Sequence, residues 1–157
     1  MEPKRKFIRF LPFFGGLISL VIGFIAHIPI GSLFSMRFHI VELHGIFYYI
    51  WGVVEGGNVW FEFVQLSLDN IVPLLLWILL LFSGICGIIG ASYKEKPATI
   101  KKLLLIGGFT VVLELLYFTV LIFINLGSVA LGLGYYGLII ISILYFLSAG
   151  LITDYQK

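Results

Sequence analysis

Four long apolar runs dominate this chain of 157 residues. Each run has about the 20 consecutive apolar residues that a helix needs to cross roughly 30 Å of bilayer hydrocarbon. Lipid offers the backbone no hydrogen-bond partners, so such runs are expected to be helical. We therefore predict an all-α membrane protein, a four-transmembrane-helix bundle that forms one domain over residues 1–157. The predicted spans are Phe7–Ile30, Ile71–Ala91, Leu103–Asn125 and Tyr135–Thr153.

The composition argues against a soluble globular protein. Hydrophobic residues make up 61% of the chain and charged residues only 11%, whereas a soluble domain has about 25% charged residues. The single cysteine, Cys86, cannot form an intrachain disulfide or a redox-active pair. The sequence has no nucleotide-binding loop and no nucleophile–base set, so we expect neither a cofactor nor enzymatic activity. The net charge of +2 gives no reason to expect nucleic-acid binding.

The basic residues lie almost entirely on one side of the predicted spans. This bias predicts that both termini and the connection between spans two and three are cytoplasmic. We expect the first span to be a retained signal-anchor, because its apolar run exceeds the roughly 7–15 residues of a cleaved signal peptide. This topology suits a prokaryotic cytoplasmic membrane. Of the 10 basic residues, only Arg37 falls outside; the others are Lys4, Arg5, Lys6, Arg9, Lys94, Lys96, Lys101, Lys102 and Lys157.

The outer segment, residues 31–70, is aromatic and acidic. Its residues alternate in Asn58–Leu66, and its β-branched and aromatic content favours strands. The glycine pair at 56–57 separates this run from Tyr48–Val54 and predicts a hairpin turn. Arg37–Leu43 is a possible third strand. We expect a small extracytoplasmic antiparallel sheet between the first two spans.

This arrangement resembles the claudin-type tetraspan proteins. The resemblance rests on four spans, a long first outer loop with strands, and Trp51-Gly52, which stands roughly where that family keeps an aromatic–glycine motif. The paired loop cysteines of the family are absent and the second outer loop is shorter. The resemblance implies a shared architecture, and a junction function is not carried over from it.

Two interpretations of the outer aromatic residues remain open and are compatible. They could pack on the helix ends and the membrane interface, or one aromatic face could be left for a protein partner. Our first functional hypothesis is a non-enzymatic accessory subunit or membrane organiser, which binds a protein partner or a second copy in the lipid bilayer. The candidate partner-binding residues are Trp51, Trp60, Phe61 and Phe63.

Glu114 lies at the middle of the third span. A charge at the centre of a membrane helix costs about 2.5–3.5 kcal/mol on insertion scales, so this residue is expected to face the bundle interior. Helical spacing places Thr110 and Tyr117 on the same stripe. The alternative functional hypothesis is a small transporter that moves an ion or proton through Glu114. The structural alternative is a neutral acid that is hydrogen-bonded to Ser19, Ser83, Ser142 or Tyr145.

Small residues recur at four-residue spacing in the first two spans. Gly15, Ser19 and Gly23 share one face of the first, and Ser83 and Gly87 share one face of the second. Such stripes permit helices to approach closely in a membrane. His27 would continue the first stripe, either as a second ionisable group or as a residue that reaches the outer interface.

Metal binding by the outer segment is the last candidate. Histidine and glutamate side chains, which are suitable metal ligands, occur there, but their spacing matches no metal motif. In a strand, His39 would also lie on the opposite face from Glu42 and His44. We expect solvated loop residues and no metal. These residues are His39, Glu42, His44 and Glu55.

Overall fold

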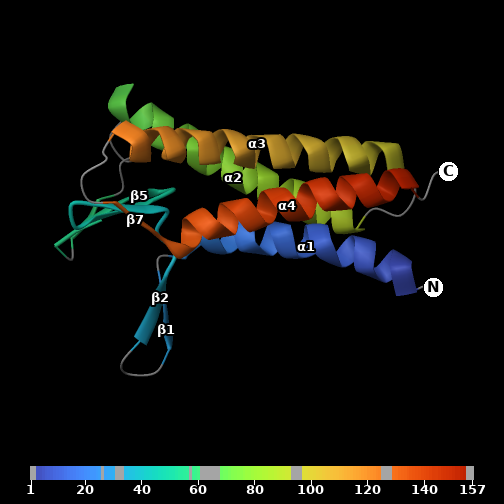
Figure 1. The fold of residues 1–157 in the computed structure, drawn as a ribbon, viewed down its shortest axis with the longest axis horizontal. Coiled ribbons are helices and arrows are strands. Elements are labelled where there is room, and N and C mark those ends of the chain that lie inside the picture. Colours follow the sequence, from blue (N-terminus) through green and yellow to red (C-terminus); the bar gives the residue numbers. More distant parts are fainter. Residues whose placement is uncertain are drawn as a thin grey trace.

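A computed structural model shows a mostly helical protein with a small antiparallel sheet at one end (Figure 1). It describes residues 3–25, 27–30, 34–56, 58–60, 68–92, 97–124 and 129–154. The helices are α1 (Pro3–Phe24), α2 (Leu68–Ser92), α3 (Pro97–Ile124) and α4 (Leu133–Asp154).

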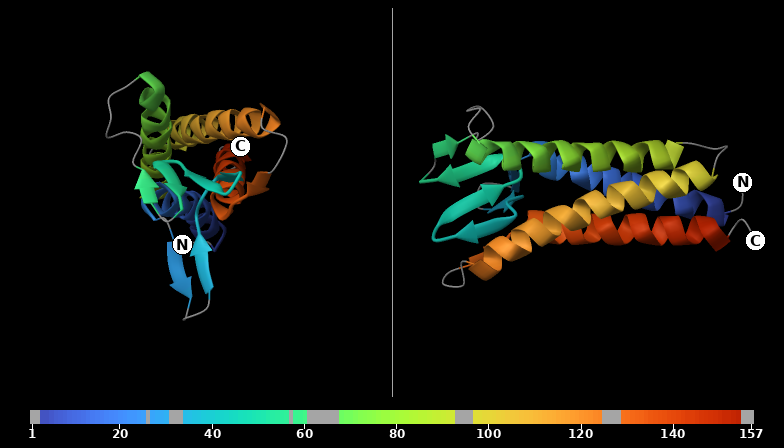
Figure 2. Two further views of the ribbon diagram at one scale, coloured as in Figure 1. Left: turned by 90° about the vertical axis from the view of Figure 1, so that its left-hand side faces the viewer. Right: turned by 90° about the horizontal axis from the view of Figure 1, so that it is seen from above.

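The four helices lie side by side and form a ring in which α1 and α3 each contact α2 and α4. Both chain ends lie at one end of the bundle, called here the terminal end, and the strands lie at the other, the sheet end (Figures 1 and 2). Three helices contain stretches long and apolar enough to cross a membrane, which confirms this part of the prediction. These stretches are Ile71–Ser92, Pro97–Ile124 and Leu133–Ile152; α1 has a shorter apolar stretch, Arg9–Phe24.

The predicted outer end of the first span is wrong. Helix α1 ends at Phe24, and His27–Ile30 forms strand β1, which pairs with β2 (Phe34–Arg37). Pro29 explains the change locally, because a proline disfavours the helical conformation of the residue before it and has no N–H to donate. At the helix end, the Trp77 Nε1 donates a hydrogen bond to the Gly23 carbonyl oxygen over 2.9 Å.

The predicted outer sheet is present, and its hairpin around Gly56–Gly57 is confirmed by the pairing of Glu55 with Asn58. Two strand predictions need correction. The run 48–54 is not one strand, because a turn at residues 50–51 divides it into the hairpin β4–β5. The candidate third strand at 37–43 is divided, because Arg37 ends β2 and only Val41–Leu43 forms β3. The strands are β3 (Val41–Leu43), β4 (Ile46–Tyr49), β5 (Gly52–Glu55), β6 (Asn58–Trp60) and β7 (Val129–Leu131), in the order β6-β5-β4-β3-β7.

Strand β7 ties the sheet to the helices. It lies between α3 and α4, in the short second loop for which no strand was predicted, and it pairs with β3. Beyond it, the Gly132 N–H donates to the Ile40 carbonyl oxygen over 3.0 Å and the Gly134 N–H donates to the His39 carbonyl oxygen over 2.9 Å. A side chain at Gly134 would approach the Phe38 carbonyl oxygen to 2.6 Å. Glycine is therefore required where the chain passes from β7 into α4.

One hydrophobic core extends from the bundle into the sheet, so that Leu80 and Leu138 belong to the same cluster as Ile40 and Trp51. The outward faces of the helices are also apolar. In the middle of α3, for example, Leu113 is 58% exposed and Phe109 is 60% exposed. A helix that is apolar on all sides is expected in a membrane and not in water.

Candidate functional site

Tyr145 of α4 occupies the centre of the bundle. Its side chain is fully buried, and the space that it fills exists because glycines face it from three other helices. A Cβ atom at Gly15 of α1 or Gly87 of α2 would overlap the tyrosine side chain, and one at Gly107 of α3 would lie 3.1 Å from its Cε2. The small-residue stripes of the first two helices therefore accommodate an aromatic ring from the fourth.

Polar groups around Tyr145 link three helices. The Tyr145 hydroxyl donates to the Ser83 carbonyl oxygen over 2.7 Å, and the Ser83 hydroxyl donates to the Gly107 carbonyl oxygen over 3.1 Å. Thr110 donates to the same Gly107 oxygen over 2.7 Å. The hydroxyl hydrogen of Thr110 is therefore used in a bond within its own helix.

Helices α1 and α2 approach closely along a second row of small residues. A Cβ atom at Gly84 would lie 3.2 Å from the Ser19 Cβ and 3.3 Å from the Gly16 carbonyl oxygen. Nearer the sheet end, a Cβ atom at Gly23 would lie 3.0 Å from a methyl group of Leu81. The sequence patterns identified Ser19 and Gly23 but missed Gly16 and Gly84. Each missed glycine directly follows a residue of a predicted stripe, and the sequence does not reveal which of two neighbouring small residues faces the partner helix.

Glu114 is fully buried in α3. Neither carboxyl oxygen has a hydrogen-bond partner among the residues that the structure describes. Three of the four partners considered from the sequence are bonded elsewhere: Ser83 and Tyr145 as above, and Ser142 to the Ile139 carbonyl oxygen over 2.8 Å. Among the described residues, Glu114 is therefore a buried acid whose carboxyl group makes no hydrogen bond to another helix.

The buried face of α3 is rotated from the predicted stripe. The buried residues at helical spacing include Gly107, Val111, Glu114 and Phe118. Tyr117 lies on an outward face, 38% exposed, with its ring against Phe118. Glu114 is thus surrounded along its own helix by apolar residues, and Thr110 and Tyr117 do not continue a polar line through it.

His27 does not continue the stripe of α1. Strand β1 contains it, and in the register of the hairpin it pairs with Arg37. The second ionisable group that the stripe would have placed at His27 therefore lacks its helical geometry.

Described aromatic residues of the outer segment, such as Tyr49 and Trp51, pack on one another and belong to the core that they share with the helices. Trp51 is 6% exposed and stacks on Tyr49 with ring centres 4.7 Å apart. The backbone of Trp60 lies in β6, opposite Val53. Phe61 and Phe63 lie outside the described residues.

A cavity of about 190 Å³ lies between the sheet and the outer ends of α2 and α3. Phe118, one turn from Glu114 on the same buried face of α3, forms part of its wall. Sequence patterns carry no signal for this cavity, since its walls come from the β4–β5 hairpin and from the two helices α2 and α3. It is lined by Tyr48, Tyr49, Ile50, Val53, Pro73, Leu76, Tyr117, Phe118 and Leu121.

His39 packs against the aromatic residues of β4. Its ring centre lies 5.1 Å from that of Phe47 and 6.2 Å from that of Tyr49. Burial lowers the pKa of His39, while Glu42 opposes and Arg37 reinforces this effect. Burial also raises the pKa of Tyr49, with Arg37 acting in the opposite direction. In the described part of the chain, no three metal-binding side chains lie close enough to hold an ion.

Comparison with known proteins gives no relative: the chain matches no family model, no curated protein and no solved structure.

Proposed function

We propose that this protein crosses the membrane four times, with both termini in the cytoplasm, and acts as a non-enzymatic interaction subunit through its outer sheet. The apolar outward faces of the helices support the membrane location. The basic residues at the terminal end, such as Arg9, Lys101 and Lys102, support the orientation. The partner would be a second membrane protein or another copy of this chain.

The observation that carries this proposal is the position of β6. Among the strands described it forms an edge of the five-stranded sheet, and the chain then continues into the aromatic residues Phe61 and Phe63. An edge strand presents N–H and C=O groups that another strand can pair with. The opposite edge strand, β7, runs almost directly into α4, with one residue between them.

The two tryptophans considered as partner contacts have different places in this proposal. Trp51 is buried in the turn between β4 and β5 and supports these two strands. Trp60 is in the edge strand itself. We therefore assign the partner contact to Trp60 and the aromatic residues that follow it, and a supporting role to Trp51.

The test replaces Trp60 with a photo-crosslinking amino acid in the full chain in its own membrane. We expect one crosslinked protein partner, either foreign or a second copy. The matched control is the same replacement at Ala130, an exposed residue of the opposite edge strand, which should give little product. Identical products from both positions, or none from position 60, would refute the assignment.

The same contact predicts a loss of affinity. Truncation of an interface tryptophan typically costs about 2 kcal/mol or more, or about thirtyfold in affinity. Trp60→Ala should therefore weaken co-purification of the crosslinked partner by at least this factor. Undiminished co-purification would assign the binding energy to other residues.

Glu114 supports a second candidate function, translocation of a proton or cation. Membrane-embedded acids mark ion paths in many transporters, and this one is buried with both oxygens unpartnered among the described residues. Glu114→Gln keeps the shape of the side chain and removes its charge, so pH-dependent flux in reconstituted vesicles should be abolished. Glu42→Gln, in the sheet, is the control and should leave the flux unchanged. Equal flux in wild type and Glu114→Gln would exclude a carboxylate mechanism.

A further inference from the structure

The hairpin β1–β2 has one apolar face and one polar face. Residues that pair directly across an antiparallel ladder share a face, and successive residues of a strand alternate between faces. The register pairs Ile28 with Met36 and Ile30 with Phe34, which gives four apolar residues on one face. The pairs on the other face are His27 with Arg37 and Pro29 with Ser35.

The hairpin is separate from the five-stranded sheet and projects sideways from the bundle. It forms its own two-stranded sheet, and two views show it extending away from the helices, roughly across the bundle axis (Figures 1 and 2). If the bundle axis follows the membrane normal, the hairpin therefore runs parallel to the membrane plane.

Arg37 indicates which way each face points. Its guanidinium carbon lies 4.8 Å from the centre of the Phe47 ring in β4, so the polar face is turned towards the sheet. Met36, the neighbouring residue on the opposite face, is 40% exposed. The apolar face is therefore turned away from the sheet, which is the side of the proposed membrane.

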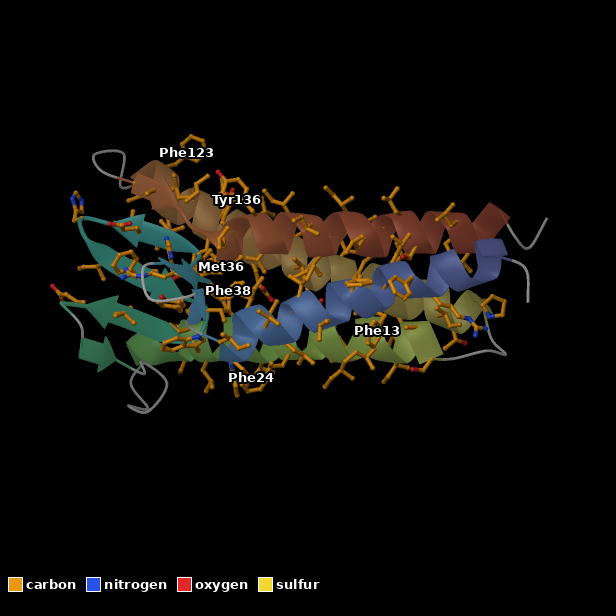
Figure 3. The ribbon with its side chains drawn as sticks, turned by 90° about the horizontal axis from the view of Figure 1, so that it is seen from below. Phe13, Phe24, Met36, Phe38, Phe123 and Tyr136 are labelled. Atoms are coloured by element: carbon orange, nitrogen blue, oxygen red, sulfur yellow. The ribbon has the colours of Figure 1, made fainter. Side chains whose placement is uncertain are left out.

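The hairpin lies level with exposed aromatic residues near the sheet end of the helices. Seen from the side on which the hairpin projects, Met36 lies at about the same position along the long axis of the bundle as Phe24 and Tyr136 (Figure 3). Phe24 is 62% exposed and Tyr136 is 51% exposed. Aromatic side chains at the ends of membrane helices typically lie at the headgroup level. The apolar face of the hairpin thus continues the apolar surface of the helices at that level.

We propose that the hairpin lies on the outer leaflet, with the face of Ile28, Ile30, Phe34 and Met36 directed to the acyl chains and the face of Arg37 directed to the headgroups and water. A two-stranded hairpin alone is marginally stable in water, and insertion of one apolar face into the bilayer supplies the missing burial. The hairpin is then a lateral anchor that fixes the rotation and depth of α1. This inference rests on the proposed membrane location.

The test uses nitroxide labels on the full chain in vesicles of phosphatidylethanolamine and phosphatidylglycerol. The native Cys86 is replaced by alanine, and single cysteines are introduced at Met36 on the apolar face, Ser35 on the polar face and Leu113 in the middle of α3. Collision with oxygen, which dissolves in lipid, is compared with collision with a water-soluble nickel chelate. We expect lipid-type accessibility at Leu113 and Met36 and water-type accessibility at Ser35.

The Leu113 label separates the two ideas. Water-type accessibility at Leu113 would refute the membrane location itself. Lipid-type accessibility at Leu113 together with water-type accessibility at Met36 would refute only the hairpin inference. Shielding of Met36 from both reagents, with spin–spin broadening between labels, would also refute it and would assign the apolar face to a second copy of the chain.

Discussion

Tyr145 determines how closely the helices of the bundle approach one another. The ring is fully buried, and the glycines that face it leave no room for a methyl group. Membrane helices lack a hydrophobic driving force for association, so close packing and interhelical hydrogen bonds have to stabilise the bundle. At the residue scale, a large side chain surrounded by glycines supplies both.

Gly87→Ala should destabilise the bundle. The added methyl group would overlap the Tyr145 hydroxyl and lie 2.6 Å from the Pro12 carbonyl oxygen, and overpacking of this kind typically costs about 1–3 kcal/mol. Unfolding in mixed detergent micelles would measure the loss. Tyr145→Phe should restore part of it in the double variant, because it removes one of the two overlapping oxygens.

Gly150→Ala is the matched control for this substitution. It lies on the same helix as Tyr145, is exposed, and has no atom within 4 Å of the position of a Cβ. We expect no loss of stability, since alanine is favoured over glycine within a helix by about 1 kcal/mol. Equal destabilisation by Gly87→Ala and Gly150→Ala would contradict the assigned role of the Tyr145 contact.

His39 predicts a pH dependence of the sheet. Its pKa is lowered in the folded protein, chiefly by burial, so the unfolded chain binds the proton more readily. The stabilisation is complete above the ordinary value of 6.5 and is lost as the pH falls from there towards the lower pKa of the folded state. The Tm of the full chain in micelles should therefore be lower at about pH 5 than at about pH 7.

Two histidine variants separate this effect from other titrations. His39→Gln should flatten the dependence of Tm on pH. His44→Asn should leave it unchanged, because His44 is an exposed turn residue with a φ of 52°, a conformation that asparagine tolerates. A dependence that persists in His39→Gln would belong to other groups.

At the scale of elements, the strand β7 brings the two connections at the sheet end of the bundle into one sheet. It pairs with β3 and continues after one residue into α4. Both edge strands of the sheet are therefore followed in the chain by a helix, β6 by α2 and β7 by α4. Glycine at position 132 permits this passage, because a Cβ there would overlap the His39 carbonyl oxygen and lie 2.6 Å from the His39 Nε2.

Gly132→Ala should detach this edge of the sheet. The methyl group would force β7 away from β3, and the amide hydrogens of Val41–Leu43 should exchange at least about tenfold faster, equivalent to about 1.4 kcal/mol of local stability. Hydrogen exchange with mass spectrometry would detect this. Ala130→Val, at an exposed position of β7, should preserve the exchange rates of wild type, and faster exchange there as well would show that the strand tolerates no change.

The elements could be predicted from the sequence where the information is local. Apolar run length identified the helices and Gly56–Gly57 identified a hairpin. The end of α1 depended on Pro29 and on pairing with β2, and β7 depended on a pairing with Val41–Leu43, which is distant in the chain. The rotation of α3 that buries Val111 and Phe118 beside Glu114 was not predictable, because a helix apolar on all sides has no hydrophobic face to orient it.

At the scale of the whole molecule, charge is distributed along the long axis. The terminal end includes Arg9, Lys101 and Lys102, and the sheet end includes Glu42 and Glu55. Basic residues near membrane helices are retained in the cytoplasm. The fold therefore agrees with the charge pattern, since residues far apart in sequence but alike in charge lie at the same end.

This agreement predicts the accessibility of single cysteines from each side of the membrane. In a Cys86→Ala chain, a cysteine at Ala130 in β7 should react with a membrane-impermeant maleimide added to intact cells. A cysteine at Ala98, in the first turn of α3, should react only after the membrane is permeabilised. In the proposed orientation the positive charges of Lys101 and Lys102 retain the start of α3 in the cytoplasm. Replacing both lysines with glutamate should therefore weaken this preference and allow labelling at position 98 in intact cells. If the cysteine at position 98 is labelled from outside while both lysines are intact, the proposed orientation is wrong. The sheet would then meet a partner on the cytoplasmic side.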